Sequence, residues 1–199
     1  NAQTLSELED IYRPYRPKRR TRASIAAEAG LTPLAELMLE QKKGVDIAAE
    51  AENYLNPEKK INTATDALNG AKDIIAERVS DNAEFRKWIR EFTYKYGNLV
   101  SKAKTEEDSV YRLYYDFSSP ISRLLDHQIL AINRGEKEGI LKPNVTLPGN
   151  EGLAVVRRAA LKPVMQVSAF IQDAADDAFD RLICPSIQRE VRNELSARA

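Results

Sequence analysis

The sequence has only one cysteine, Cys184, and one histidine, His127, among its 199 residues. A single cysteine excludes an internal disulfide, which is typical of proteins from a reducing cytoplasm. A lone histidine and a lone cysteine, far apart in sequence, do not supply a zinc site or a thiol nucleophile with its base. We therefore interpret His127 as structural or exposed and Cys184 as a buried, inert thiol, and we expect no catalytic residues, no metal and no cofactor.

Long apolar runs and nucleotide-binding motifs are also missing. No stretch of about 18 apolar residues is present, and no charged-then-apolar start indicates a signal peptide. Residues 135–139 contain two glycines without the spacing of a phosphate-binding loop. With 43% hydrophobic and 30% charged residues, the chain is expected to be a globular protein. Together with the missing motifs and apolar runs, this predicts a non-enzymatic, cytoplasmic protein with no membrane partner.

Helical periodicity covers most of the chain. Only 8 glycines occur, and we expect them to separate helical segments rather than lie inside them. Thr32 and Thr63 are typical N-cap residues ahead of two such segments. The predicted fold class is mainly α and multi-helical. The segments predicted as helices are 5–13, 22–29, 32–41, 46–54, 63–79, 81–96, 106–115, one beginning at 118–120, 126–138, 152–161, 164–182 and 185–199.

Few segments have the alternation of a β-strand. Residues 140–147 alternate around Pro143, which fits a short edge strand, and residues 99–103 fit either a strand or a helix extension. We therefore expect at most a short β-hairpin near residues 139–148. The whole chain, 1–199, is interpreted as a helical fragment of a larger protein. Its predicted sub-parts are 3–100 and 101–199, with residues 1–2 left from cloning.

Positive charge is concentrated in one stretch, residues 12–22, which we call the basic segment. The chain as a whole balances 30 basic against 30 acidic residues, so the six cations of this segment leave the remainder net negative. Two prolines, at 14 and 17, favour an extended segment rather than a helix. We hypothesise that the segment contacts RNA or DNA phosphates, with its tyrosines available for stacking. The candidate nucleic-acid-binding residues are Tyr12, Arg13, Tyr15, Arg16, Lys18, Arg19, Arg20 and Arg22.

A structural interpretation of the basic segment is equally consistent with the sequence. Arginines in a proline-restrained segment can lie across acidic helices of the net-negative remainder and join parts of the protein. In that case the positive charges would be neutralised internally and would contribute to stability rather than to binding. Both interpretations stay open on the sequence alone.

Three segments resemble signatures of the bacterial Tex transcription-accessory proteins. They are residues 8–22, which include the basic segment, residues 129–139 and residues 181–190. The resemblance implies the helical N-terminal to central region of a multi-domain cytoplasmic protein, with helix-turn-helix-like elements. It further implies that this region precedes an RNase-H-like domain, helix-hairpin-helix elements and an S1 RNA-binding domain. In that family, nucleic-acid binding is attributed chiefly to the S1 domain.

Two functions follow from the residues and the resemblance together. The first is a non-enzymatic helical scaffold and nucleic-acid-binding module of a Tex-like transcription accessory or elongation factor, binding RNA or DNA weakly through residues 12–22. The alternative is a protein-interaction scaffold with no nucleic-acid binding of its own. Its expected partners are the remaining Tex domains and, as further candidates, RNA polymerase or the ribosome.

Overall fold

A computed structural model describes residues 5–15, 20–40, 42, 44–105, 107–147, 154 and 169–199. Their contacts divide the chain into two compact units. Unit 1 comprises Asn1–Phe85 and Leu153–Ile183, and unit 2 comprises Arg86–Gly152 and Cys184–Ala199. Each unit thus combines an earlier and a later stretch of the chain, whereas the division at residue 100 expected from the sequence is contiguous.

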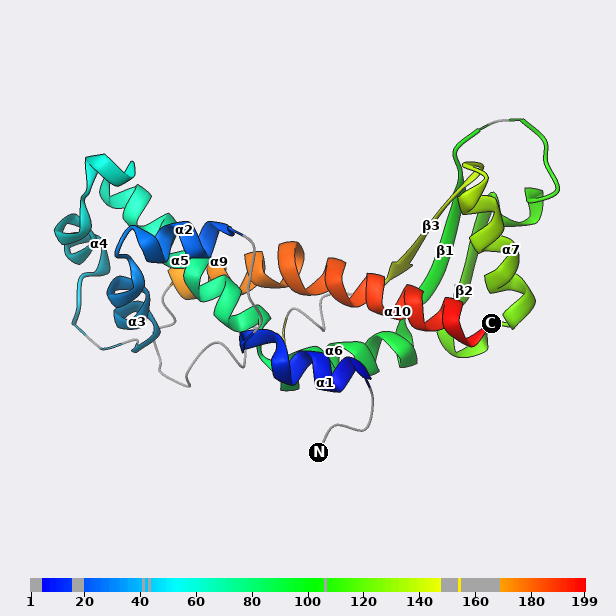
Figure 1. Cartoon of the computed structure of the whole chain (residues 1–199), viewed down its shortest axis with the longest axis horizontal. Coiled ribbons are helices and arrows are strands. Elements are labelled where there is room, and N and C mark those ends of the chain that lie inside the picture. The colour runs from blue at the N-terminus through cyan, green and yellow to red at the C-terminus, as the bar shows by residue number, and fades with distance from the viewer. Residues whose placement is uncertain are drawn as a thin grey trace. The chain divides into compact units, whose positions relative to one another are not determined.

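Unit 1 is helical and is organised around one long helix, α5, which contacts α2, α3, α4 and α9 (Figure 1). A π-helical turn follows α9 directly. The mainly α class predicted from the sequence is confirmed here. The elements of unit 1 are α1 (Leu5–Tyr12), η1 (Arg13–Tyr15), α2 (Arg22–Glu28), α3 (Thr32–Glu40), α4 (Ile47–Ala51), η2 (Glu52–Tyr54), η3 (Pro57–Lys59), α5 (Ala64–Ser80), α9 (Ala169–Asp177) and η6 (Ala178–Ile183).

The start of α5 is determined locally by a capping box. The Thr63 side chain accepts a hydrogen bond from the Asp66 backbone N–H at 3.1 Å, and the Asp66 carboxylate accepts one from the Thr63 N–H at 2.9 Å. Two backbone donors that have no partner within the helix are satisfied in this way. The predicted N-cap at Thr63 is confirmed.

Substitution of Thr63 by alanine is expected to lower the free energy of unfolding by about 1 kcal/mol, because the N-terminal amides of α5 lose their side-chain acceptor. Urea denaturation monitored by circular dichroism measures this change. Thr65→Ala is the matched control, since Thr65 is an exposed threonine within the same helix. An equal loss in both variants would contradict a role for the cap.

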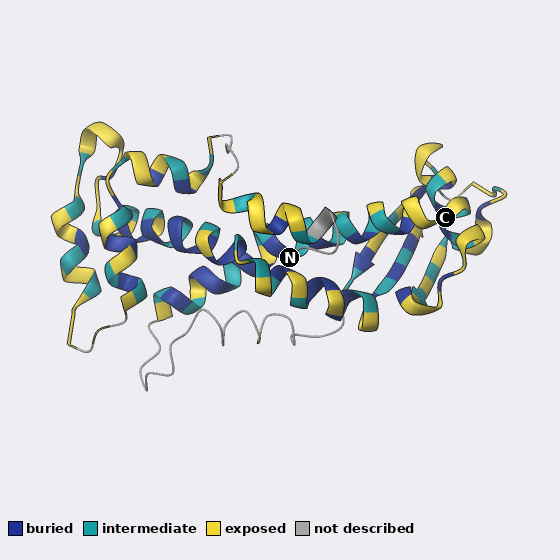
Figure 2. Ribbon diagram, turned by 60° about the horizontal axis from the view of Figure 1, so that its bottom comes forward, coloured by how far each residue is buried: buried dark blue, intermediate teal, exposed yellow. Residues whose placement is uncertain are grey.

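Unit 2 combines helices with a small antiparallel sheet of strand order β2-β1-β3. Helices α7 and α10 both pack against the edge strand β3 and against each other (Figure 1). Positions along β1 and β3 alternate between buried and more exposed (Figure 2). The elements are α6 (Ala83–Tyr96), which begins before the unit boundary, β1 (Asn98–Ala103), η4 (Arg112–Tyr114), β2 (Asp116–Pro120), η5 (Ile121–Arg123), α7 (Asp126–Lys137), β3 (Leu141–Thr146) and α10 (Cys184–Arg198).

The sheet corrects the expectation of at most a short hairpin near residues 139–148. The predicted edge strand around Pro143 is present as β3, but its partner is β1, with Pro143 opposite Ser101. A third strand, β2, begins at Asp116 and ends at Pro120, where a helix was predicted to begin. Its exposed and partly buried residues alternate, and Pro120 stands at the strand end, where a missing N–H is tolerated.

One further predicted helix is absent, and another lies mostly outside the described residues. For residues 106–115 the described part, from residue 107 onward, holds only the single 3-10 turn Arg112–Tyr114, so the predicted helix is wrong there. The predicted helix 152–161 lies outside the described residues except for residue 154.

Two glycines lie inside helices, against the expectation that glycines separate them. Gly70 is in α5 and Gly135 is in α7. A Cβ on Gly70 would overlap the Leu31 side chain, and one on Gly135 would come within 2.6 Å of Leu141 Cδ1. Both glycines therefore permit close packing of a neighbouring element against the helix.

Candidate functional site

The described part of the basic segment is helical at its start. Tyr12 ends α1, and residues 13–15 form the 3-10 turn η1, so the predicted extended conformation is wrong for these three residues. The fixed φ of proline fits the first turn of a helix as well as an extended chain, and here Pro14 is accommodated in the turn. Arg16, Lys18 and Arg19 lie outside the described residues.

Described arginines of the basic segment face carboxylates of unit 1. Arg13 Nε lies 3.3 Å from Asp81 Oδ1, and the Asp81 side chain is only 14% exposed. Arg20 lies 3.8 Å from Glu28, but both side chains are largely exposed, so this pair contributes little. Burial raises the pKa of Asp73, and the positive charges of Arg181 and Arg22 oppose that rise. The ion pair between Arg13 and Asp81 thus connects the start of the basic segment to the end of α5.

An apolar row lies beside these arginines. Tyr15 is 78% exposed, and Leu8, Ile11 and Tyr12 are each more than half exposed. Their spacing places them on one side of α1 and its continuation into η1. The tyrosines proposed for stacking are therefore accessible, and they belong to a surface that is apolar as well as basic.

A cluster of buried charges joins α6 to α10 within unit 2. Glu190 accepts from Arg86 and, at 2.9 Å, from Arg90 Nη2, while Arg86 also donates to Ser186 Oγ at 3.0 Å. The Arg86 side chain has no exposed surface, and that of Arg90 is 9% exposed. We call these four residues the Glu190 cluster. Because buried charges are costly when unpaired, loss of one partner would destabilise the contact between α6 and α10.

A second contact between the same helices involves Tyr94, whose hydroxyl donates to Glu194. Burial and the neighbouring carboxylate raise the pKa of Tyr94. The phenol therefore keeps its proton and remains a donor at neutral pH.

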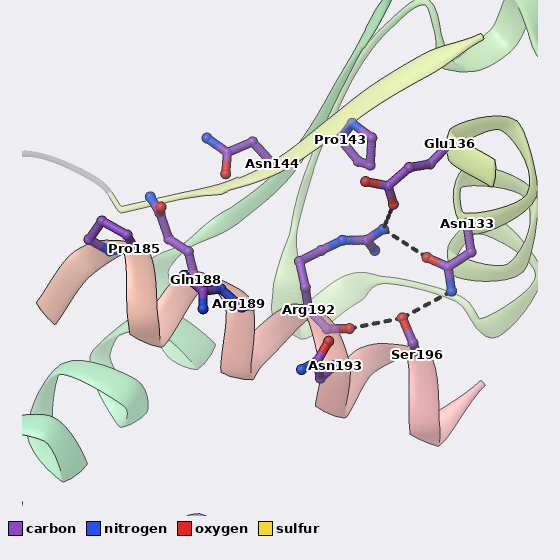
Figure 3. A pocket seen from close by; sticks show the side chains of 10 residues that line it. All are labelled: Asn133, Glu136, Pro143, Asn144, Pro185, Gln188, Arg189, Arg192, Asn193 and Ser196. Carbon is purple, nitrogen blue, oxygen red and sulfur yellow. Dashed lines mark hydrogen bonds and ion pairs between the residues drawn. The ribbon is translucent and has the colours of Figure 1, made fainter. Parts of the chain in front are cut away.

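A polar pocket lies on another side of α10, between α7, β3 and α10 (Figure 3). Its volume is about 430 Å³. Carboxamide and charged side chains dominate its lining, which consists of Asn133, Glu136, Pro143, Asn144, Pro185, Gln188, Arg189, Arg192, Asn193 and Ser196.

One wall of the pocket is held by a hydrogen-bond network. Arg192 Nη2 donates to Asn133 Oδ1 and to Glu136 Oε2, both at 2.8 Å. Asn133 Nδ2 donates to Ser196 Oγ at 3.0 Å, and Ser196 donates to the Arg192 carbonyl at 2.9 Å. These contacts join α7 to α10 and fix the side chains of the wall before any ligand binds.

The part of the chain that the structure describes has neither a cluster of metal-ligating side chains nor a membrane-spanning helix. Among those residues, no group of three or more His, Cys, Asp or Glu side chains could hold a metal ion. His127 is exposed at the start of α7, and Cys184 is half-buried at the start of α10. None of the described helices is long and apolar enough to cross a bilayer.

Residues 42–199 match the family model described as Tex central region-like. The chain belongs to the Tex family. It is 42% identical over 200 residues to the uncharacterized protein YdcI of Bacillus subtilis, covering 98% of this chain and 28% of that protein. It is 48% identical over 149 residues to protein tex of Bordetella pertussis, covering 73% of this chain and 19% of that protein.

A human relative is more distant but matches the whole chain. The S1 RNA-binding domain-containing protein 1 is 28% identical over 219 residues, covering 100% of this chain and 21% of that protein. The Tex-family chain therefore spans less than a third of the length of these curated relatives. The predicted resemblance to Tex is confirmed, while the basic segment precedes the residues matched by the family model.

The sequence did not predict the pocket of this Tex-family chain. Residues 133–137 were unremarkable because their charges are mixed in sign, and polar residues on a helix are typical of a solvated face. A usable signal was the spacing of Gln188, Arg192 and Ser196, which places three polar residues along one side of α10. Two of the segments that resemble Tex, 129–139 and 181–190, contribute residues to the pocket.

Proposed function

We propose that this Tex-family chain is a non-catalytic helical scaffold of a transcription accessory protein and that its basic segment contacts nucleic-acid phosphates. One observation supports the proposed contact of the basic segment with phosphates. Arg13 is held by Asp81, while the neighbouring Tyr15 side chain and the Arg20 side chain are 78% and 73% exposed. An anchored segment that presents an aromatic ring beside cations suits a flexible single strand, because phosphates and bases can be contacted together.

The names of two relatives support the proposal. One relative is the transcriptional accessory protein Tex of Neisseria gonorrhoeae, and the human relative is named for an S1 RNA-binding domain. Positive charge gathered on an otherwise net-negative chain would attract RNA or DNA and orient it toward residues 12–22. Such binding is expected to be weak and sensitive to salt.

Changing Arg16, Lys18, Arg19 and Arg20 together to serine tests the proposal. Fluorescence anisotropy with single-stranded RNA and with duplex DNA, each over a range of salt concentrations, measures the binding. Loss of four phosphate contacts is expected to reduce the slope of log affinity against log salt by about 3. The melting temperature is expected to change little, because Arg13 and its contact with Asp81 are retained.

A matched control removes the same charge elsewhere. Lys102, Lys104, Arg123 and Lys142 are exposed cations of unit 2, and their joint change to serine is expected to leave most of the binding in place. Equal losses in both variants would indicate general attraction by charge and would contradict a site in the basic segment.

A second candidate function is protein interaction without nucleic-acid binding, and the apolar row of Leu8, Ile11, Tyr12 and Tyr15 favours it. In that case the arginines of the basic segment would join parts of the protein and contribute to its stability. Partners would be the other domains of a longer Tex protein, RNA polymerase or the ribosome. Absence of binding by the unmodified chain, together with a serine variant that melts early, would favour this function over the first.

A further inference from the structure

We propose that the pocket between α7, β3 and α10 binds a short extended peptide segment that carries one acidic side chain. The site lies entirely within unit 2, so it is separate from the basic segment and goes beyond the function proposed above. Three features of the pocket support this ligand: side chains with unused hydrogen-bonding capacity, one positive charge unpaired among the described residues, and a lining without aromatic side chains.

Four pocket side chains are available to a ligand. Within the described part of the chain, Asn144, Gln188, Arg189 and Asn193 make no side-chain hydrogen bond or ion pair. They contrast with the wall formed by Arg192 and its partners, whose groups already bond one another. The pocket thus combines a fixed wall with unused donors and acceptors, and its volume of about 430 Å³ lies within the usual range of ligand sites.

Carboxamides suit a peptide backbone. Each presents a carbonyl acceptor and an N–H donor, which is the pair of groups that a peptide unit offers in return. Gln188 on α10 and Asn144 on β3 face the same space from opposite sides (Figure 3), and Asn193 lines the pocket one turn after Arg189. An extended segment in this space can therefore be hydrogen-bonded from both sides.

The charge of the pocket calls for a single carboxylate. Arg192 is neutralised by Glu136 at 2.8 Å. Arg189 is exposed and has no acidic partner among the described residues, so one positive charge remains. A guanidinium pairs with a carboxylate through two parallel hydrogen bonds, which gives direction as well as strength.

A nucleic acid fits the pocket less well. Glu136 keeps 49% of its side chain exposed at the pocket, where it can accept a hydrogen bond from a peptide N–H but not from a phosphodiester, which has no donor. No aromatic side chain is among the pocket residues, so bases have no surface on which to stack. A peptide supplies both donors and acceptors, whereas a phosphate group supplies acceptors alone, and the mixed lining therefore favours the peptide.

The peptide is not expected to pair with β3 as a further strand. Pro143 lacks a backbone N–H, which interrupts the donors along this edge strand. Recognition is assigned instead to the side chains of Gln188, Arg189, Asn193 and Asn144.

The test uses the full 199-residue chain labelled with ¹⁵N and the blocked peptide acetyl-Ala-Ala-Glu-Ala-Ala-amide, which has one carboxylate. We expect saturable shifts of the side-chain amide signals of Asn144, Gln188 and Asn193 at millimolar peptide. Arg189→Gln is expected to weaken binding about tenfold, because a charge-assisted hydrogen bond is lost. Arg123→Gln, which removes an exposed arginine of unit 2 outside the pocket, is expected to leave the affinity unchanged.

Further probes separate the alternatives. The peptide with Gln in place of Glu is expected to bind about tenfold more weakly, and inorganic phosphate and an octauridylate are expected to leave these signals unshifted. The proposal is overturned if the acidic peptide produces no shifts at the pocket, if Arg189→Gln and Arg123→Gln bind alike, or if the oligonucleotide saturates the same signals at lower concentration. Because the basic segment is unchanged in all these variants, either proposal can fail without the other.

Discussion

Replacement of Glu190 by glutamine is expected to lower the free energy of unfolding by about 3–5 kcal/mol. Glu190 is the carboxylate shared by Arg86 and Arg90, two side chains with little or no exposed surface. Glutamine has nearly the same shape but carries no charge, so both guanidinium groups stay buried without this counter-ion. Urea denaturation followed by circular dichroism, together with the melting temperature, measures the loss.

Glu91→Gln is the control for this substitution. Glu91 lies on α6, as do the two arginines, but it is exposed. Its change is expected to stay within about 0.5 kcal/mol. A Glu190 variant as stable as the Glu91 variant would show that water reaches the Glu190 cluster and screens its charges.

Replacement of Ile132 by alanine is expected to destabilise the protein by about 2–5 kcal/mol. Ile132 lies on α7 and is fully buried in unit 2, where α7 packs against β3. Loss of its side chain removes apolar contacts and leaves a cavity that the surrounding elements fill only in part. The same denaturation experiment measures the effect.

Leu130→Ala is the matched control on the same helix. Leu130 is 51% exposed, so its removal costs little burial, and alanine is a good helix former. Its change is expected to remain within about 0.5 kcal/mol. Comparable losses for the two variants would contradict the orientation of α7, and with it the placement of Asn133 and Glu136 in the pocket.

The helices with strong local signals could be predicted from the sequence. Helix α5 begins after the N-cap Thr63, and α2 is followed by Gly30 with a φ of +90°, the left-handed conformation typical of a helix end. The last helix was predicted for residues 185–199 and is found at Cys184–Arg198. Capping and periodicity act within a few residues, so one sequence suffices to detect them.

The sheet could not be predicted in the same way. Strand β1 pairs with both β2 and β3, and these partners are brought together only by the fold. Asp116–Pro120 contains two serines and a proline, which also favour a helix start. The pairing with β1 overrides that local preference, as is common for strands.

The two candidate sites also differ in how far the local sequence predicts them. The basic segment is a local feature, since charge and proline content identify it without any structure. The pocket is assembled from α7, β3 and α10, and its polar residues resemble a solvated helix face until the opposing elements are in place. Its existence therefore depends on tertiary contacts that periodicity does not encode.

The discontinuous composition of the two units has a consequence for synthesis on the ribosome. Unit 1 needs α9 and unit 2 needs α10, and both helices follow residue 168. Neither unit can be completed before the residues after position 168 have been translated, and Arg86 cannot pair with Glu190 until then. Because contacts between distant parts of a chain slow folding, we expect both units to acquire their final packing late, and nearly together, rather than one after the other during translation.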